Sequence, residues 1–217
     1  VYDQWVSHRI PFNDPRVVTA LDQAGNILKN DAYVNGGLGN AKSIATTSFT
    51  TAGLPILDGS CFLHRQASFY QVNWPTDKKI AEDGDVFAFR LPGTTETDPP
   101  LLMGGEFAAA FSDREEVRAF QAYLTSPEFS NAKAKVTGPG WISANNKLDP
   151  SILSSPVDRL SYELITSDNS VLRFDASDQM PGSVGTGSFW VGMTDWVSLE
   201  KSSQDVLTEI ENSWPKS

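Results

Sequence analysis

The sequence predicts an α/β fold, in which helices alternate with a few short, apolar strands. Two observations favour this fold. Capping residues placed directly before a proline, which mark helix starts, recur along the chain, whereas apolar runs of strand length are short and few. The 217 residues, 40% of them hydrophobic and 20% charged, suit one globular domain or two small lobes with a sizeable buried core.

The first half of the chain contains one strongly marked helix. Asp14-Pro15 combines a capping carboxylate with a proline at the first helical position, and the apolar residues that follow share one face, which predicts a helix over residues 15–30. Residues 43–58 indicate a short helix and a turn. The apolar runs SCFLHR (60–65) and DVFAFRLP (85–92) are predicted to be strands, and 93–100 a loop.

The second half is predicted to be mostly helical. Asp113, with Glu116 three residues later, is close to a capping box and is expected to cap a helix. Ser126-Pro127 and Ser155-Pro156 are two further helix starts. The predicted helices after the first of these starts are 127–136, 156–167, 189–199 and 203–214, with a turn at 138–141.

Composition excludes several functions. The formal net charge of −10 argues against a nucleic-acid surface, which requires a basic face. No stretch approaches the roughly 18 apolar residues of a membrane-spanning helix. Cys61 is the only cysteine, so no internal disulfide can form, and with His8 and His64 it does not resemble a zinc site. We expect no cofactor and no metal.

The stretch RFDASDQMPGSVGTGSFW, residues 173–190, combines two carboxylates, three glycines and an aromatic pair. Its glycines lack the spacing and the lysine of a phosphate-binding loop, and an EF-hand would need a closing glutamate where Thr186 stands. Asp175 and Asp178 leave three interpretations open: a catalytic pair, caps of a turn, or acceptors for ligand hydroxyls.

Aromatic residues beside turns and glycines indicate a carbohydrate ligand, because aromatic faces suit the C–H faces of sugar rings. Trp196 follows Trp190 on the same predicted helix and is expected to lie in the core. The residues of this kind are Phe69, Tyr70, Trp74, Trp141, Phe189, Trp190 and Trp196.

Four segments together resemble the later half of bacterial extracellular solute-binding proteins, the substrate receptors of ABC importers. The similarity is greatest to the sugar-binding family of maltose, trehalose/maltose and alpha-glucoside receptors. The segments are FNDPRVVTALDQAGNIL, LPILDGSCFLHRQASFYQVNWP, LLMGGEFAAAFSDREEVRAFQAYLTSPE and RFDASDQMPGSVGTGSFWVGMTDWV, in the family's order and covering nearly the whole chain.

The resemblance implies a periplasmic-binding-protein-like (type II) fold with a sugar between two lobes. Residues 1–103 and 141–217 would form most of the second lobe, and 104–140 a crossing segment that belongs to the first. The rest of the first lobe would lie in a missing N-terminal half, so the chain is expected to be a piece of a longer protein. Its other partners would be membrane permease subunits, and its location the periplasm or, as a lipoprotein, the cell surface.

The resemblance also implies ligand-binding residues. Phe69, with Tyr70 next, matches an aromatic sugar platform, and Trp190 matches a tryptophan that stacks on the sugar. Thr194 stands where maltose-binding protein has an arginine. Glu106 stands where some relatives have an aromatic residue, so a hydroxyl-binding carboxylate would replace stacking there. The remaining candidates are Gly104, Gly105, Arg65, Asp175 and Asp178.

A receptor of this kind makes and breaks no bond, so the resemblance implies that the protein is not an enzyme. Two alternatives remain. One is a secreted carbohydrate-active enzyme that uses Asp175, Asp178 or Glu106 as acid and base. The other is a receptor of the same fold for a ligand that is not a sugar.

Overall fold

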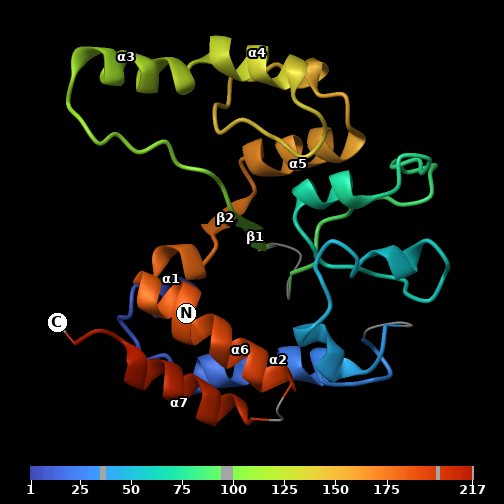
Figure 1. Cartoon of the computed structure of the whole chain (residues 1–217), viewed down its shortest axis with the longest axis vertical. Coiled ribbons are helices and arrows are strands. Elements are labelled where there is room, and N and C mark those ends of the chain that lie inside the picture. Colours follow the sequence, from blue (N-terminus) through green and yellow to red (C-terminus); the bar gives the residue numbers. More distant parts are fainter. Residues whose placement is uncertain (35–37, 94–99, 199–200, 217) are drawn as a thin grey trace. The chain divides into compact units, whose positions relative to one another are not determined.

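The computed structural model describes residues 1–34, 38–93, 100–198 and 201–216 (Figure 1). The chain divides into two compact units. Unit 1 consists of two stretches far apart in sequence, Val1–His64 and Phe174–Ser217, and unit 2 is the continuous stretch Arg65–Arg173. None of the helices in the described ranges has the length and apolar character that a membrane crossing requires.

Unit 1 is helical. Its α-helices are α1 (Tyr2–Val6), α2 (Pro15–Leu28), α6 (Phe189–Ser198) and α7 (Ser203–Ser213). Its shorter helical turns are η1 (Ala41–Ala45), η2 (Leu54–Ile56), η5 (Ser177–Gln179) and η6 (Ser183–Ser188).

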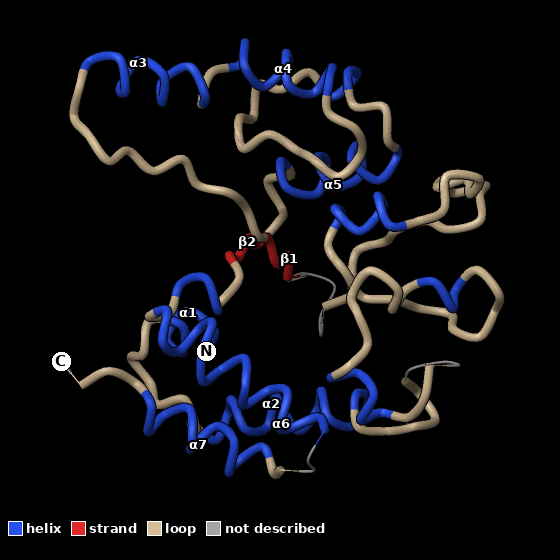
Figure 2. The backbone as a smooth tube through the Cα atoms, in the orientation of Figure 1, coloured by secondary structure: helices blue, strands red, loops and turns tan. Residues whose placement is uncertain are grey.

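Unit 2 contains helices and a two-stranded sheet. The last residue of the second strand, Phe174, already belongs to unit 1. The α-helices of unit 2 are α3 (Glu115–Leu124), α4 (Pro127–Val136) and α5 (Pro156–Thr166), and its shorter turns are η3 (Ser68–Asn73) and η4 (Pro150–Ile152). The strands β1 (Pro100–Met103) and β2 (Val171–Phe174) pair with each other (Figure 2).

The helices predicted from capping residues are confirmed. The side chain of Asp14 accepts a hydrogen bond from the Arg16 backbone N–H, and the hydroxyls of Ser126 and Ser155 cap α4 and α5 in the same way. The predicted cap at Asp113 is wrong. Helix α3 begins after Arg114 without a side-chain cap, and the Asp113 carboxylate accepts instead from Arg118 at 2.9 Å. Leu199, the last residue of the predicted helix 189–199, lies outside the described residues.

The two predicted strands are wrong. Residues 60–65 form no strand, and the side chains of Phe62 and Leu63 are 89% and 69% exposed. Residues 85–92 contain only an isolated bridge between Val86 and Ile80. A strand needs a neighbouring strand for a continuous ladder of backbone hydrogen bonds, and in the described part of the chain neither run pairs with one beyond this bridge. The broad prediction of a mixed helix-and-sheet chain is confirmed, and of the predicted loop 93–100, residues 94–99 are not described.

Unit 1 has an apolar core between its first and last helices. Figure 1 shows α2 beside α6 and α7, although they come from opposite ends of the chain. Gly192 makes the approach of α6 to α7 possible, because a Cβ there would lie 3.0 Å from side-chain carbons of both Val206 and Ile210. The fully buried side chains of this core are Phe12, Val184, Val206, Leu207 and Ile210.

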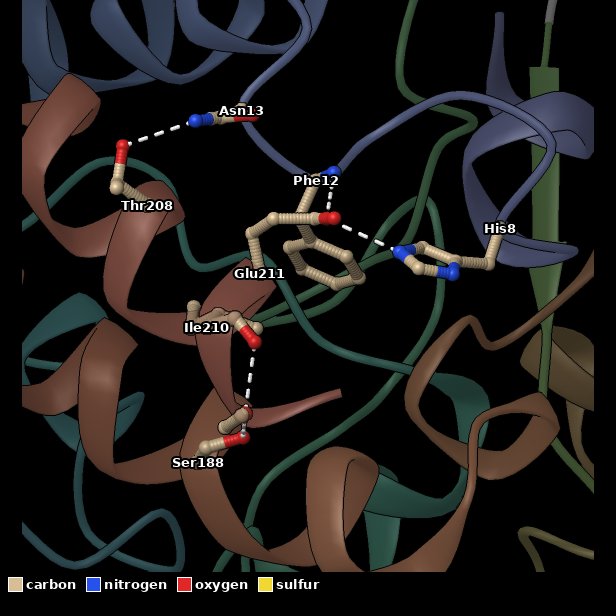
Figure 3. Close-up of polar contacts among 8 residues, drawn as sticks. His8, Phe12, Asn13, Ser188, Thr208, Ile210 and Glu211 are labelled. Atoms are coloured by element: carbon tan, nitrogen blue, oxygen red, sulfur yellow. Dashed lines mark hydrogen bonds and ion pairs between the residues drawn. The ribbon is translucent and has the colours of Figure 1, made fainter. Parts of the chain in front are cut away.

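Polar contacts tie the N-terminal segment to α7 (Figure 3). The Glu211 carboxylate accepts a 2.6 Å hydrogen bond from the Phe12 backbone N–H, and the same oxygen lies 3.0 Å from His8 Nε2. The His8 ring stacks on Trp214 at 4.0 Å between ring centroids. Asn13 donates to the Thr208 hydroxyl at 3.0 Å. These contacts surround the buried Phe12 ring and fix the loop before α2.

Unit 2 has a smaller apolar cluster and a more polar interior. Leu148, Leu153 and Tyr162 pack together, and the Tyr162 hydroxyl donates to the backbone carbonyls of Asn146 and Leu148. Three polar side chains are also buried beside α5, namely Gln71, Ser155 and Asp158. The interior of unit 2 is therefore held by hydrogen bonds as well as by apolar packing.

Candidate functional site

Trp190 presents an aromatic ring to solvent on the first turn of α6. It is 71% exposed, whereas Trp196 on the same helix is 4% exposed. Trp196 is a core residue, as predicted, and its indole N–H donates to the Ser203 hydroxyl at 3.1 Å. Thr194, which stands where maltose-binding protein has an arginine, donates its hydroxyl to the Trp190 carbonyl at 2.9 Å. The exposed ring thus stands on a helix anchored by its opposite face.

Asp175 holds a turn. Its Oδ1 accepts hydrogen bonds from the backbone N–H and the hydroxyl of Ser177, at 2.9 and 2.6 Å. Asp178 is the residue after Ser177 and is exposed on η5. Of the three interpretations of the two aspartates, the cap of a turn is the one that describes Asp175 in this structure.

The Asp175 turn packs on the segment that leads to Trp190. A Cβ at Gly185 would lie 2.0 Å from the Ser177 carbonyl oxygen, so the backbones of η5 and η6 approach closely at a residue without a side chain. Gly182, three residues earlier, has no atom within 4 Å of an added Cβ. Gly185 is therefore needed for packing inside unit 1.

In unit 2, Phe69 and Tyr70 differ in exposure. Phe69, on η3, is 43% exposed, whereas Tyr70 is 3% exposed. The Tyr70 ring packs edge-on against Trp74, with centroids 5.0 Å apart and an interplanar angle of 80°. Phe69 is thus the more exposed aromatic residue of this pair, and Tyr70 is packed inside unit 2.

The other predicted residues of unit 2 lie on its surface. Gly104, Gly105 and Glu106 follow β1 and are exposed, as is Arg65 at the start of the unit. The structure thus groups the predicted ligand residues by unit. Asp175, Asp178 and Trp190 belong to unit 1, and Arg65, Phe69, Tyr70, Gly104, Gly105 and Glu106 to unit 2.

The sequence did not predict a buried polar cluster near the Phe69 backbone, formed by Gln71, Ser155 and Asp158. Asp158, 3% exposed, accepts hydrogen bonds from the Gln71 side-chain amide at 2.6 Å and from the Gly140 backbone N–H at 3.1 and 3.2 Å to its two oxygens. Burial raises the pKa of Asp158, against the opposing effect of these donors and of Arg159. The only local signal was the spacing of Ser155 and Asp158, which is that of a capping box with aspartate as its second member.

No metal site is evident in the described ranges. No group of three or more histidine, cysteine or acidic side chains there could hold an ion. The Cys61 thiol, which lies in an apolar run of the sequence, is partly exposed and donates to the Leu63 carbonyl at 3.1 Å.

The chain is related to bacterial binding proteins along nearly its whole length. Over 218 residues, 99% of the chain, it is 40% identical to the osmoprotective compounds-binding protein GgtB of Synechocystis sp. (strain ATCC 27184 / PCC 6803 / Kazusa). Over 222 residues, 98% of the chain, it is 34% identical to the alpha-glucosides-binding periplasmic protein AglE of Rhizobium meliloti (strain 1021). No family model and no solved structure matches.

The predicted resemblance to bacterial extracellular solute-binding proteins is confirmed by these relatives. The chain spans about half the length of the curated relatives that it matches, 49% of the first and 46% of the second. Both relatives are named for binding and neither for a reaction.

Proposed function

We propose that this chain is part of the solute-binding component of an ABC importer, and that the whole protein binds a sugar or sugar-like compound outside the cytoplasm. The observation that carries the proposal is the identity to two binding proteins along almost the entire chain. One relative is named for alpha-glucosides and the other for osmoprotective compounds, so we propose a small, neutral, hydroxyl-rich solute. The location would be the periplasm or, for a lipoprotein, the cell surface.

The exposed aromatic rings support a sugar ligand. A tryptophan ring that is largely in solvent leaves a broad apolar face uncovered, and Trp190 does so on a helix whose other side is packed. Phe69 offers a second ring in unit 2. Stacking of such rings on the C–H faces of a pyranose, with Arg65, Glu106 and Asp178 as partners for hydroxyls, would recognise a sugar without any reaction.

We further propose the two-lobed, type II arrangement. Residues 1–103 and 141–217 would belong to the second lobe, and 104–140 would cross to a first lobe contributed mainly by the other half of the protein. One observation supports this assignment: no residue from Gly104 to Leu124 is buried, although the segment includes the apolar residues Phe107, Phe111 and Phe120. Apolar residues exposed in this number are typical of a surface that another part of a protein covers.

Isothermal titration of the full-length protein with a panel of alpha-glucosides and other polyols tests the function. We expect saturable heat and an unchanged solute recovered afterwards. Release of a monosaccharide would contradict the proposal and favour an enzyme that uses Asp175, Asp178 or Glu106. Binding of a charged or peptide solute, with none of any sugar, would favour a receptor for another ligand.

A further inference from the structure

The turn that carries Phe69 is stabilised by hydrogen bonds of the Gln71 side chain. The Gln71 side-chain amide donates to Asp158 at 2.6 Å and to the Ser68 carbonyl at 2.9 Å, and its carbonyl oxygen accepts from the Ser155 hydroxyl. Ser155 also caps α5. Gln71 and Asp158 are both buried. Loss of the hydrogen bond between Gln71 and Asp158, or of the one between Ser155 and Gln71, would therefore leave a buried polar group unsatisfied.

The same carboxylate fixes a second backbone segment against Phe69. Both oxygens of Asp158 accept from the Gly140 N–H, at 3.1 and 3.2 Å. Gly140 has φ +100°, a conformation that favours glycine, and a Cβ there would lie 3.2 Å from Phe69 Cα and 3.4 Å from its carbonyl oxygen. The Gly140 backbone therefore packs directly on the backbone of Phe69.

Asp158 thus connects the two segments on either side of the exposed ring. Through Gln71 it fixes the residues that follow Phe69, and through Gly140 it fixes the surface that the Phe69 backbone rests on. Tyr70, the residue after Phe69, is buried against Trp74 and adds an apolar contact to these hydrogen bonds. An exposed ring on a backbone held in this way loses little conformational freedom when a ligand stacks on it.

We propose that Asp158 is a positioning residue for solute binding, which pre-organises the Phe69 platform through Gln71 and Gly140. The inference rests on the proposed function, because it assumes that Phe69 contacts the solute. Asp158 itself is too deeply buried to touch a ligand. Its contribution to affinity would therefore be transmitted entirely through Phe69.

A double-mutant cycle on solute affinity tests this coupling in the full-length protein. In the wild-type background we expect Asp158→Asn to raise the Kd for the bound solute about tenfold, because an amide has one accepting oxygen in place of two and lacks the negative charge that strengthens the hydrogen bonds from Gln71 and Gly140. In the Phe69→Ala background the same substitution should change Kd less than about twofold, since there is no ring left to position. A merely structural role would give equal losses in both backgrounds, and that result would overturn the proposal.

Two matched controls accompany the cycle. Asp168→Asn makes the same chemical change at an exposed aspartate of unit 2 and should leave Kd unchanged. Gly140→Ala inserts a methyl group against the Phe69 backbone and should reproduce the effect of Asp158→Asn, whereas Gly138→Ala, which has no atom within 4 Å of its Cβ, should not.

Hydrogen–deuterium exchange of the 217-residue chain tests, without any ligand, whether Asp158 stabilises the turn that carries Phe69. We expect faster exchange in the peptide that covers residues 66–74 in Asp158→Asn than in Asp168→Asn, and no difference there would overturn the proposal. The two levels of failure are distinguishable. If the wild-type protein binds no solute, the proposed function fails and the platform with it; if it binds but Phe69→Ala keeps affinity within twofold, only the positioning inference fails.

Discussion

Trp190 in unit 1 and Phe69 in unit 2 are both exposed aromatic residues, but the structure anchors them by opposite kinds of interaction. Trp190 begins a helix whose inner face packs into an apolar core through Gly192, Trp196 and Val197. Phe69 lies on a short turn that a buried carboxylate holds by hydrogen bonds. The apolar anchor depends on shape and volume, whereas the polar anchor depends on every donor having its acceptor.

This difference predicts which changes each unit tolerates. The core of unit 1 around α6 should be most sensitive to changes in side-chain volume, whereas unit 2 near Asp158 should be most sensitive to the loss of a hydrogen-bond partner. Interdigitated apolar cores lose stability when a side chain is removed or a methyl is added. Buried polar clusters lose stability when one hydrogen-bond partner is removed and the other is left unsatisfied.

The largest effect is expected from removing the buried tryptophan of α6. Trp196→Ala should lower the free energy of unfolding by about 3–5 kcal/mol, because it leaves a large cavity in the unit 1 core. Trp190→Ala, on the same helix, should change it by less than about 0.5 kcal/mol. Urea unfolding followed by circular dichroism gives both values, and similar losses for the two variants would contradict the contrast in exposure.

A methyl group at Gly185 is expected to have the next largest effect. Gly185→Ala should destabilise unit 1 by about 1–3 kcal/mol, because its Cβ would collide with the Ser177 carbonyl and force η5 and η6 apart. Gly182→Ala is the matched control and should be nearly neutral. Thermal melting of the two variants measures the difference, and equal melting temperatures would show that the close approach is not needed.

A smaller free-energy change, in binding rather than stability, is expected at Trp190. Trp190→Ala should weaken solute binding by the full-length protein about tenfold, or about 1.4 kcal/mol, through loss of a stacking face. Trp190→Phe should recover part of this loss. Titration calorimetry measures both, and an affinity for Trp190→Ala within twofold of the wild type would remove Trp190 from the candidate site.

The smallest effect expected is a pH dependence of opposite sign in the two units. Burial alone would raise the pKa of Glu211, but the hydrogen bonds from Phe12 and His8 and the charge of His8 outweigh it and lower that pKa. Glu211 therefore contributes stability above its ordinary pKa of 4.5, and this contribution is lost as the pH falls through the folded value. Burial raises the pKa of Asp158, so its contribution is present below 3.8 and is lost as the pH rises through the folded value.

Unfolding between pH 3 and pH 6 separates the two contributions. The stability advantage of wild type over Glu211→Gln should shrink as the pH falls. The stability of wild type relative to Asp158→Asn should instead decrease as the pH rises. The same sign for both comparisons would contradict the opposite pKa shifts of the two carboxylates.

The sequence predicted helices well because their signals are local. Asp14, Ser126 and Ser155 each cap a helix through a backbone N–H two or three residues away. Strands depend on a distant partner. SCFLHR is as apolar as a strand but forms none, whereas VLRF at 171–174, which the sequence did not single out, pairs with residues 100–103.

The candidate site shows the same difference between local signals, which the sequence reveals, and distant contacts, which it does not. Seven aromatic residues beside glycines and turns can be recognised in the sequence, and the resemblance to sugar receptors selected Trp190 and Phe69 among them. Both are exposed, and their role as ligand platforms stays a prediction. Asp158 could not be predicted, since its partner Gln71 is 87 residues away in the chain. A capping aspartate at a helix start is common, and only the fold shows that this one is buried.

The division of unit 1 into two distant stretches has a consequence for how the chain is made. Helix α2 is synthesised before unit 2, whereas the residues that bury its apolar face, on α6 and α7, are synthesised after it. Unit 2 is continuous and can complete its core before α6 and α7 have been translated. The core of unit 1 forms only after unit 2 has been made, and during that interval residues 1–64 expose apolar surface that a chaperone could recognise.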